Sequence, residues 1–180
     1  MVLASGRTPD GVPYEYLAQK FARRNGVIYS VCLTHWFPYA RETGASGYCG
    51  RGYPPTKAYG KAWPKQIMAR SFGFLGKDEP ATAYLALVGF ARAQVARIRV
   101  VHKDGKGATR DAPVKFVRVR GALRKRVGSA EPFGFFVTFL PPSIKRYYDG
   151  PGDRADGSPA IEVIAYDDRG KEIERFKHRN

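Results

Sequence analysis

The sequence predicts an all-β fold, and three observations favour it. Short apolar runs recur along the chain, turn residues separate them, and no convincing long helix interrupts them. From Arg97 to Val100, arginine and apolar residues alternate, which is the two-residue period of a strand with one buried face. Roughly nine or ten such segments at regular spacing are typical of a β-sandwich or a β-barrel.

Length and composition describe a globular protein. The 180 residues are 43% hydrophobic and 13% aromatic, which is enough for one sizeable core or two small β units. No run approaches the roughly 18 apolar residues that a transmembrane helix needs. The opening residues lack the basic region followed by an apolar region that marks a signal peptide. We therefore expect no transmembrane segment in this chain.

The first 78 residues are predicted to form an N-terminal β unit. Residues 14–22 fit both a helix capped by Gly26 and a strand. Asn25-Gly26 stands between this stretch and the strand-like run 27–34, and Asn-Gly between two apolar runs is a strong hairpin signal. We expect strand–turn–strand here, with the helix as the open alternative.

The first unit ends with loops and a third strand. Residues 35–66 are rich in aromatic residues, Gly and Pro and have no regular period, which predicts loops. Residues 67–74 predict a strand. The Pro-Asp-Gly at residues 9–11 predicts a turn within the lead-in that precedes residue 14.

Residues 79–180 are predicted to form a second β unit. Asp104-Gly105 supplies the positive φ that a tight turn needs, so we expect the chain to double back there. Residues 133–140, FGFFVTFL, are apolar almost throughout and predict a strand that is buried on both faces. The strands expected in this unit are residues 84–90, 95–102, 114–120, 133–140, 161–166 and 171–176.

Three stretches of the second half, LVGFARAQVARIRVVHKDGK, FGFFVTFLPP and IEVIAYDDRGKEIER, carry a recognisable pattern. The pattern is an apolar VxG strand, a VarVrV strand, a DG turn, an FF…LP strand and a closing AyDadGrel hairpin. It resembles the C-terminal portion of a group of uncharacterised actinobacterial cell-envelope proteins over residues 82–176. The resemblance implies an Ig-like antiparallel β-sandwich over these residues, and it implies no catalytic residues. Together with the strand pattern of the first half, we expect this sandwich to have an additional N-terminal β unit.

Cys32 and Cys49 are the two cysteines of the chain, and a cysteine pair in the N-terminal half is also similar to that group. A disulfide between them would close a loop of about 16 residues and stabilise the fold by roughly 3 kcal/mol. Such a bond implies an oxidising compartment. Two unlinked buried thiols are the open alternative. A metal site built with His35 lacks a fourth ligand, so we expect no metal.

Nothing in the sequence predicts an enzyme. A thiol nucleophile needs a base and an orienting group, and no motif around His35 or His102 supplies them. No glycine-rich phosphate loop follows a strand and opens a helix. The carboxylates of Asp167 and Asp168 lie in a turn signal, where such residues serve the turn itself. We therefore expect no catalytic residues and no cofactor.

The positive charge is concentrated in the middle of the chain. Residues 51–126 contain 18 Lys/Arg and 4 Asp/Glu, a net charge of +14 out of +15 for the whole chain. Such an excess indicates an anionic partner, although a solvated face without a partner stays open. The residues predicted to contact that partner, on the outward face of adjacent strands, are Arg97, Arg99, Arg118, Arg120, Arg124, Lys125 and Arg126.

These observations favour a non-enzymatic, extracytoplasmic structural or interaction domain whose basic face contacts an anionic cell-envelope component or a partner protein. The alternative is a nucleic-acid-binding β domain, intracellular or phage-type, that uses the same face together with Trp63, Tyr53 and Tyr59 for stacking. A Cys32–Cys49 bond favours the first, and steeply salt-dependent binding of single strands favours the second. The sequence leaves a cytoplasmic location and the oligomeric state open.

Overall fold

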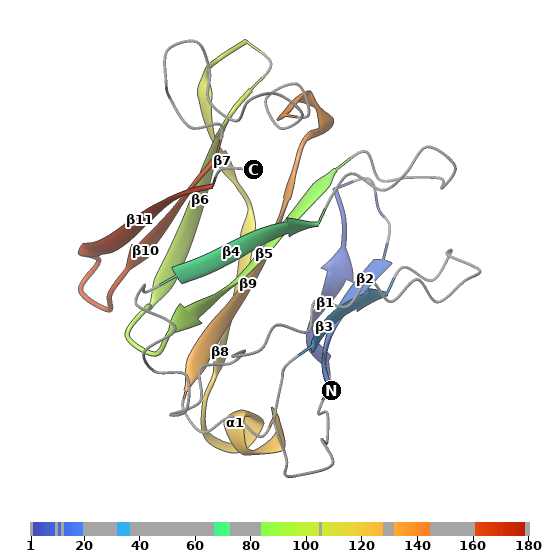
Figure 1. Cartoon of the computed structure of the whole chain (residues 1–180), viewed down its shortest axis with the longest axis vertical. Helices are drawn as coiled ribbons and strands as arrows, with labels where there is room; N and C mark the ends of the chain where they lie inside the picture. Colours follow the sequence, from blue (N-terminus) through green and yellow to red (C-terminus); the bar gives the residue numbers. More distant parts are fainter. Residues whose placement is uncertain are drawn as a thin grey trace, which may run out of the picture. The chain divides into compact units, whose positions relative to one another are not determined.

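The computed structural model is mostly β (Figure 1), so the predicted all-β class is confirmed. The residues that it describes are 2–9, 11, 13–19, 32–36, 67–72, 84–104, 106–127, 132–144 and 161–178. The chain divides into two compact units. Unit 1 contains residues 1–64 and 117–134, and unit 2 contains residues 65–116 and 135–180.

Unit 1 contains a three-stranded antiparallel sheet in the order β1 (Val2–Arg7), β2 (Pro13–Gln19), β3 (Cys32–Trp36). The turn between β1 and β2 lies where Pro-Asp-Gly predicted one. Gly11 has a φ of 87°, which glycine adopts without strain, and its N–H donates to the carbonyl of Thr8 at 2.8 Å. The predicted turn is therefore confirmed, and the residues before it form a strand that the sequence pattern did not indicate.

The ambiguous stretch at residues 14–22 is a strand from Pro13 to Gln19, and the helical alternative is wrong for these residues. Tyr14 and Tyr16 explain the outcome, because both are buried on one face, two positions apart. Their rings make an edge contact with centroids 5.6 Å apart. Gly6 pairs with Tyr14 across the sheet, and its missing side chain leaves room for the tyrosine ring. Asn25-Gly26 lies outside the described residues.

Two four-stranded sheets lie mainly in unit 2, although their residues 117–119 and 133–134 belong to unit 1. One has the strand order β4-β5-β9-β8 and the other the order β11-β10-β6-β7. The pairs β4–β5, β6–β7, β6–β10 and β10–β11 are antiparallel. The strands are β4 (Ile67–Phe72), β5 (Leu85–Arg92), β6 (Arg97–Lys103), β7 (Thr109–Ala112), β8 (Val114–Val119), β9 (Phe133–Leu140), β10 (Ile161–Tyr166) and β11 (Glu172–His178).

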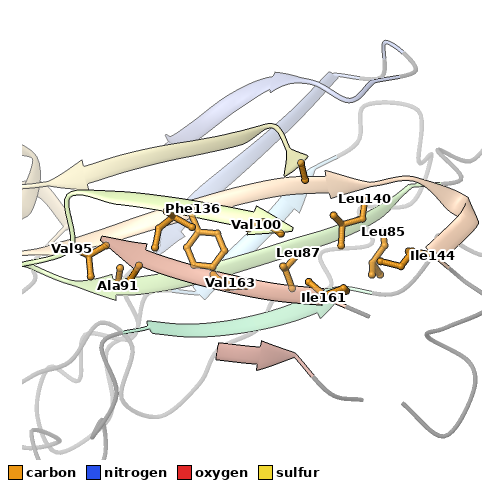
Figure 2. Packing of buried hydrophobic residues seen from close by; sticks show 13 residues of the cluster. Leu85, Leu87, Ala91, Val95, Val100, Phe136, Leu140, Ile144, Ile161 and Val163 are labelled. Atoms are coloured by element: carbon orange, nitrogen blue, oxygen red, sulfur yellow. The ribbon is translucent and has the colours of Figure 1, made fainter. Parts of the chain in front are cut away.

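The core of unit 2 takes apolar side chains from both of these sheets (Figure 2). Leu87 on β5 and Phe136 on β9 come from one sheet, and Val100 on β6 and Val163 on β10 come from the other. All four are fully or almost fully buried. Since one cluster contains residues of both sheets, the two sheets form two layers of one hydrophobic core.

Strand β9 is buried along its whole length, which confirms the prediction made from FGFFVTFL. Phe136 belongs to the core cluster, and its chain neighbour Phe135 points to the opposite face, as successive strand residues do. There the ring of Phe135 packs on Phe90 of β5, with centroids 5.8 Å apart. The sheet β4-β5-β9-β8 is therefore apolar on both faces at β5 and β9.

The predicted doubling back at Asp104 is confirmed, because Lys103 at the end of β6 pairs with Thr109 at the start of β7. A carboxylate oxygen of Asp104 accepts hydrogen bonds from the N–H groups of Lys106 and Ala108, both at 2.9 Å, and holds the turn together. Gly105 lies outside the described residues.

Two features differ from the sequence-based expectation. The expected unit boundary at residues 78/79 falls between β4 and β5, but these strands pair with each other inside unit 2. Residues 121–127 form a short helix, α1 (Gly121–Val127), where cations on strands were expected. Ala, Leu, Arg and Lys are strong helix formers, so the local sequence GALRKRV accounts for this helix. No helix in the described ranges is long and apolar enough to cross a membrane.

Candidate anion-binding surface

The seven cations predicted to form one basic face lie in two separate parts of the chain. Arg97 and Arg99 are on β6, in the sheet β11-β10-β6-β7. The other five lie on β8 of the other sheet, in the connection that follows it, and on α1. The expectation that adjacent strands present all of them is therefore wrong, because β6 neighbours β10 and β7 while β8 neighbours β9. We call residues 114–127 the basic segment.

Strand β6 alternates as its sequence predicts. Ile98 and Val100 are buried and belong to the core cluster, whereas Arg97 and Arg99 are exposed on the opposite face of the sheet. The two arginines thus lie on the solvent side, as expected for residues that contact a ligand. Their neighbours on β7 and β10 determine whether their charges are available.

Arg99 forms a two-pronged ion pair with Asp111 on β7. Its Nε donates to one carboxylate oxygen at 2.6 Å, and one of its terminal nitrogens donates to the other at 3.2 Å. The side chains are 47% and 62% exposed, so water screens the pair. These hydrogen bonds hold the pKa of the Asp111 carboxyl below its usual range and raise the pKa of Arg99. The charge of Arg99 is therefore already matched within the sheet.

Arg97 stacks on an aromatic ring of the neighbouring strand. Its guanidinium carbon lies 4.2 Å from the ring centroid of Tyr166, which is its cross-strand partner on β10. This distance is that of a cation–π contact. On the far side of β10, Arg175 of β11 bonds both to Glu162 of β10 and, at 2.8 Å, to Glu172 of its own strand. One arginine therefore crosses each strand junction on the outer face of this sheet.

The basic segment differs from the outer face of β6, β7 and β10, because its sequence contains cations and no acidic residues. It contains six Lys/Arg and no Asp or Glu. Its first part is β8, at the edge of its sheet, where Val114 and Phe116 pack against the core cluster while Lys115 is exposed. Arg118 is half-buried near the end of the strand. The strand anchors the segment, and the cations lie beside and beyond the anchoring side chains.

The second part of the basic segment is α1. Gly121 has a φ of 52° at the start of the helix, and the N–H of Arg124 donates to the carbonyl of Arg120 at 3.1 Å in the first turn. Lys125 and Arg126 follow in the last turn, where cations interact favourably with the helix dipole. Both side chains are exposed, as is that of Arg120.

Within the described ranges, no carboxylate forms an ion pair with Arg120, Lys125 or Arg126. This separates them from Arg99, whose charge is matched by Asp111. A cation without a nearby acid contributes its full charge to the local potential and attracts anionic ligands. Of the predicted contact residues, these three are the best placed to bind an anion.

The remaining predicted residues give less information. Cys32 lies in β3 opposite Gln19, but Cys49 is outside the described residues, so their disulfide stays a prediction.

His102 is buried, and its Nδ1 lies 3.2 Å from the carbonyl oxygen of Lys103. Among the residues with described positions, no three His, Cys, Asp or Glu side chains are grouped as metal ligands. The stacking aromatics Trp63, Tyr53 and Tyr59 are also outside the described residues.

Sequence reasoning missed the partners of the β6 arginines. Asp111 and Tyr166 meet Arg99 and Arg97 only because β6 lies between β7 and β10, and β10 is remote from β6 in sequence. A count along the β6–β7 hairpin would have brought Asp111 near Arg99 if the turn length had been known. No comparable signal pointed to Tyr166.

Comparison of the chain with protein-family models, with curated proteins and with solved structures gave no match.

Proposed function

We propose that this protein is a non-enzymatic, extracytoplasmic binding protein whose basic segment contacts an anionic component of the cell envelope. One observation carries the proposal: residues 114–127 have six cations and no acid, and three of the cations are exposed without an ion-pair partner among the described residues. A local excess of this kind attracts and orients anionic ligands. Arg97 and Arg99 take a structural role in this proposal, because their interactions join strands.

The strand order of unit 2 supports an Ig-like sandwich as the scaffold. When β4 to β11 are lettered A, B, C, C′, D, E, F and G in chain order, the two sheets read A-B-E-D and G-F-C-C′. Ig-like domains place A, B, E and D in one sheet and G, F and C in the other, with C′ added next to C in some of them. The agreement covers all eight strands.

The extracytoplasmic location rests on the sequence. The resemblance to actinobacterial envelope proteins covers residues 82–176, and the predicted Cys32–Cys49 bond requires an oxidising compartment. Ig-like scaffolds serve many unrelated functions, so the proposed binding role is argued from the basic segment and not from the scaffold.

Binding to defined polyanions tests the proposal. The probes are a polyglycerol-phosphate wall polymer and a single-stranded oligonucleotide of equal charge, each labelled for fluorescence anisotropy. The test variant neutralises Arg120, Lys125 and Arg126 together by substitution with Gln. The control variant removes the same number of exposed cations elsewhere, by Lys106→Gln, Arg169→Gln and Lys171→Gln.

We expect the test variant to bind the wall polymer about tenfold to a hundredfold more weakly, since each exposed charge contact contributes up to about 1 kcal/mol. The control variant should lose much less. Equal losses in the two variants would mean that only the net charge of the protein matters and would contradict the proposal. A clear preference for the oligonucleotide, with steep salt dependence, would instead support the nucleic-acid alternative.

A further inference from the structure

The exposed face of α1 carries two of the three cations that have no ion-pair partner among the described residues. Ala122, Lys125 and Arg126 are exposed, whereas Leu123 and Arg124 are half-buried. Residues three and four positions apart are neighbours on a helix surface, so Lys125 and Arg126 both lie next to Ala122. The exposed face of α1 is therefore a short strip with a cation on each side of a small neutral residue.

The third of these cations, Arg120, lies one helical turn before Arg124. Its carbonyl accepts the N–H of Arg124 at 3.1 Å, which is the hydrogen bond between residues four apart in an α-helix. One turn rises by about 5.4 Å, and Lys125 and Arg126 follow directly, so their backbones lie roughly 7–8 Å beyond that of Arg120 along the helix axis. The strip therefore presents positive charge at two levels.

The separation of the two levels determines which anion fits. All three side chains could reach a single small anion only if they converged, and the repulsion between like charges opposes that. A linear polymer with one negative charge per repeat can place successive charges near successive cations, so the side chains need not converge. Once one charge of such a polymer is bound, the next contact forms within the complex at a high effective concentration.

We propose that the exposed face of α1 and Arg120 bind a linear phosphodiester polymer of the cell envelope, with successive phosphate groups at the two levels. This proposal rests on the proposed function and specifies its ligand as a chain of repeated charges. Phosphate groups suit both kinds of cation, because the guanidinium fork of arginine binds two phosphate oxygens and lysine binds phosphate as a point charge. Free phosphate, which offers only one group, should bind weakly.

Glycerol phosphate oligomers of defined length test the two levels. The probes contain one, two, four or eight phosphate groups and a fluorescent label, and their binding is compared at equal concentrations of phosphate groups. We expect the affinity per phosphate to rise at least about fivefold from one group to four, because the second contact forms within the complex. The variant Arg120→Gln removes the first level and should reduce this rise more than it weakens binding of the single-phosphate probe.

The variant Ala122→Glu tests the exposed face of α1 without removing a cation. A carboxylate at this position precedes Lys125 and Arg126 by three and four residues, where oppositely charged side chains pair on a helix. Glutamate is a good helix former and is favourable in the first turn, so the fold should persist, as measured by urea unfolding. We expect the eight-phosphate probe to bind Ala122→Glu at least about fivefold more weakly than Ala122→Gln, which has nearly the same size and no charge.

The outcomes separate this proposal from the proposed function. If the affinity per phosphate does not depend on length, and inorganic phosphate competes as well as an oligomer, the linear ligand is refuted. The proposed function still holds in that case if neutralising Arg120, Lys125 and Arg126 together weakens binding of the wall polymer.

Two other results would also overturn the proposal. Equal binding by Ala122→Glu and Ala122→Gln would mean that the ligand does not lie on this face of α1. Tighter binding of an oligonucleotide with the same number of phosphate groups would assign the face to nucleic acid. If no oligomer binds at low salt, the proposed function fails as well.

Discussion

Replacing Phe136 with alanine tests the two-layer core of unit 2 directly. Phe136 is fully buried on β9, and in Figure 2 its ring lies among side chains from both sheets. A buried phenylalanine removes roughly 150 Å² from water, which at about 25 cal/mol per Å² corresponds to about 4 kcal/mol. Phe-to-Ala changes in protein cores cost about 3–5 kcal/mol, including the cavity that remains. We therefore expect Phe136→Ala to lower the free energy of unfolding by about 4 kcal/mol.

Urea unfolding followed by circular dichroism measures this loss, and thermal melting should show a Tm lower by roughly 8–16 °C for a chain of this size. Val2→Ala is the matched control, because Val2 is 44% exposed and its truncation should change stability by less than about 0.5 kcal/mol. A loss below about 1 kcal/mol for Phe136→Ala, with an unchanged urea dependence, would mean that the ring is not enclosed by both sheets.

Three further predictions concern an ion pair, a turn and the cysteines. The hydrogen bonds from Arg99 lower the pKa of Asp111, so the Asp111 carboxylate stabilises the fold above its usual pKa and loses this effect as the pH falls through the lowered value. We therefore expect Asp111→Asn to flatten the acid side of a curve of unfolding free energy against pH. An unchanged curve would refute the ion pair. Gly170 has a φ of 79°, and a side chain added there would meet open space. Gly170→Ala should therefore lower the free energy of unfolding by about 1 kcal/mol through backbone strain alone, as measured by urea unfolding. D-alanine at the same position should leave that free energy unchanged. Intact mass with and without reductant, on protein from its native compartment, should show Cys32 and Cys49 joined, and two thiols that alkylate without reductant would contradict the extracytoplasmic proposal.

Much of the strand pattern could be predicted from local sequence. A strand with one buried face shows alternating apolar and polar residues, and a strand buried on both faces shows a continuous apolar run. The apolar run of β9 and the alternating run of β6 lie where the sequence indicated them, and β10 has the predicted bounds. Strand β1 shows neither pattern, because Leu3 and Ala4 are both buried at a register irregularity and break the alternation.

The candidate site was less predictable, because it depends on which strands become neighbours. Periodicity places Arg97 and Arg118 on strand faces but says nothing about the sheet to which each strand belongs. The chain passes from one sheet to the other between β5 and β6, so arginines that look equivalent in sequence lie in different sheets. Local composition could have indicated α1, because Ala, Leu, Arg and Lys are strong helix formers. The sequence-based prediction instead placed its cations on strands.

The pairing of β6 with β10 has a consequence for how unit 2 folds. The hairpins β6–β7 and β10–β11 each join strands that are close in sequence, but the sheet is complete only when Arg97 meets Tyr166 across the long intervening stretch that includes β8 and β9. The chain loses conformational entropy when it brings remote segments together, before their contacts can stabilise the fold, so β proteins dominated by such contacts fold on timescales of milliseconds to seconds. Until that junction closes, the inner edges of both hairpins are open, and this interval is when the unfinished sheet is most exposed to pairing with another chain.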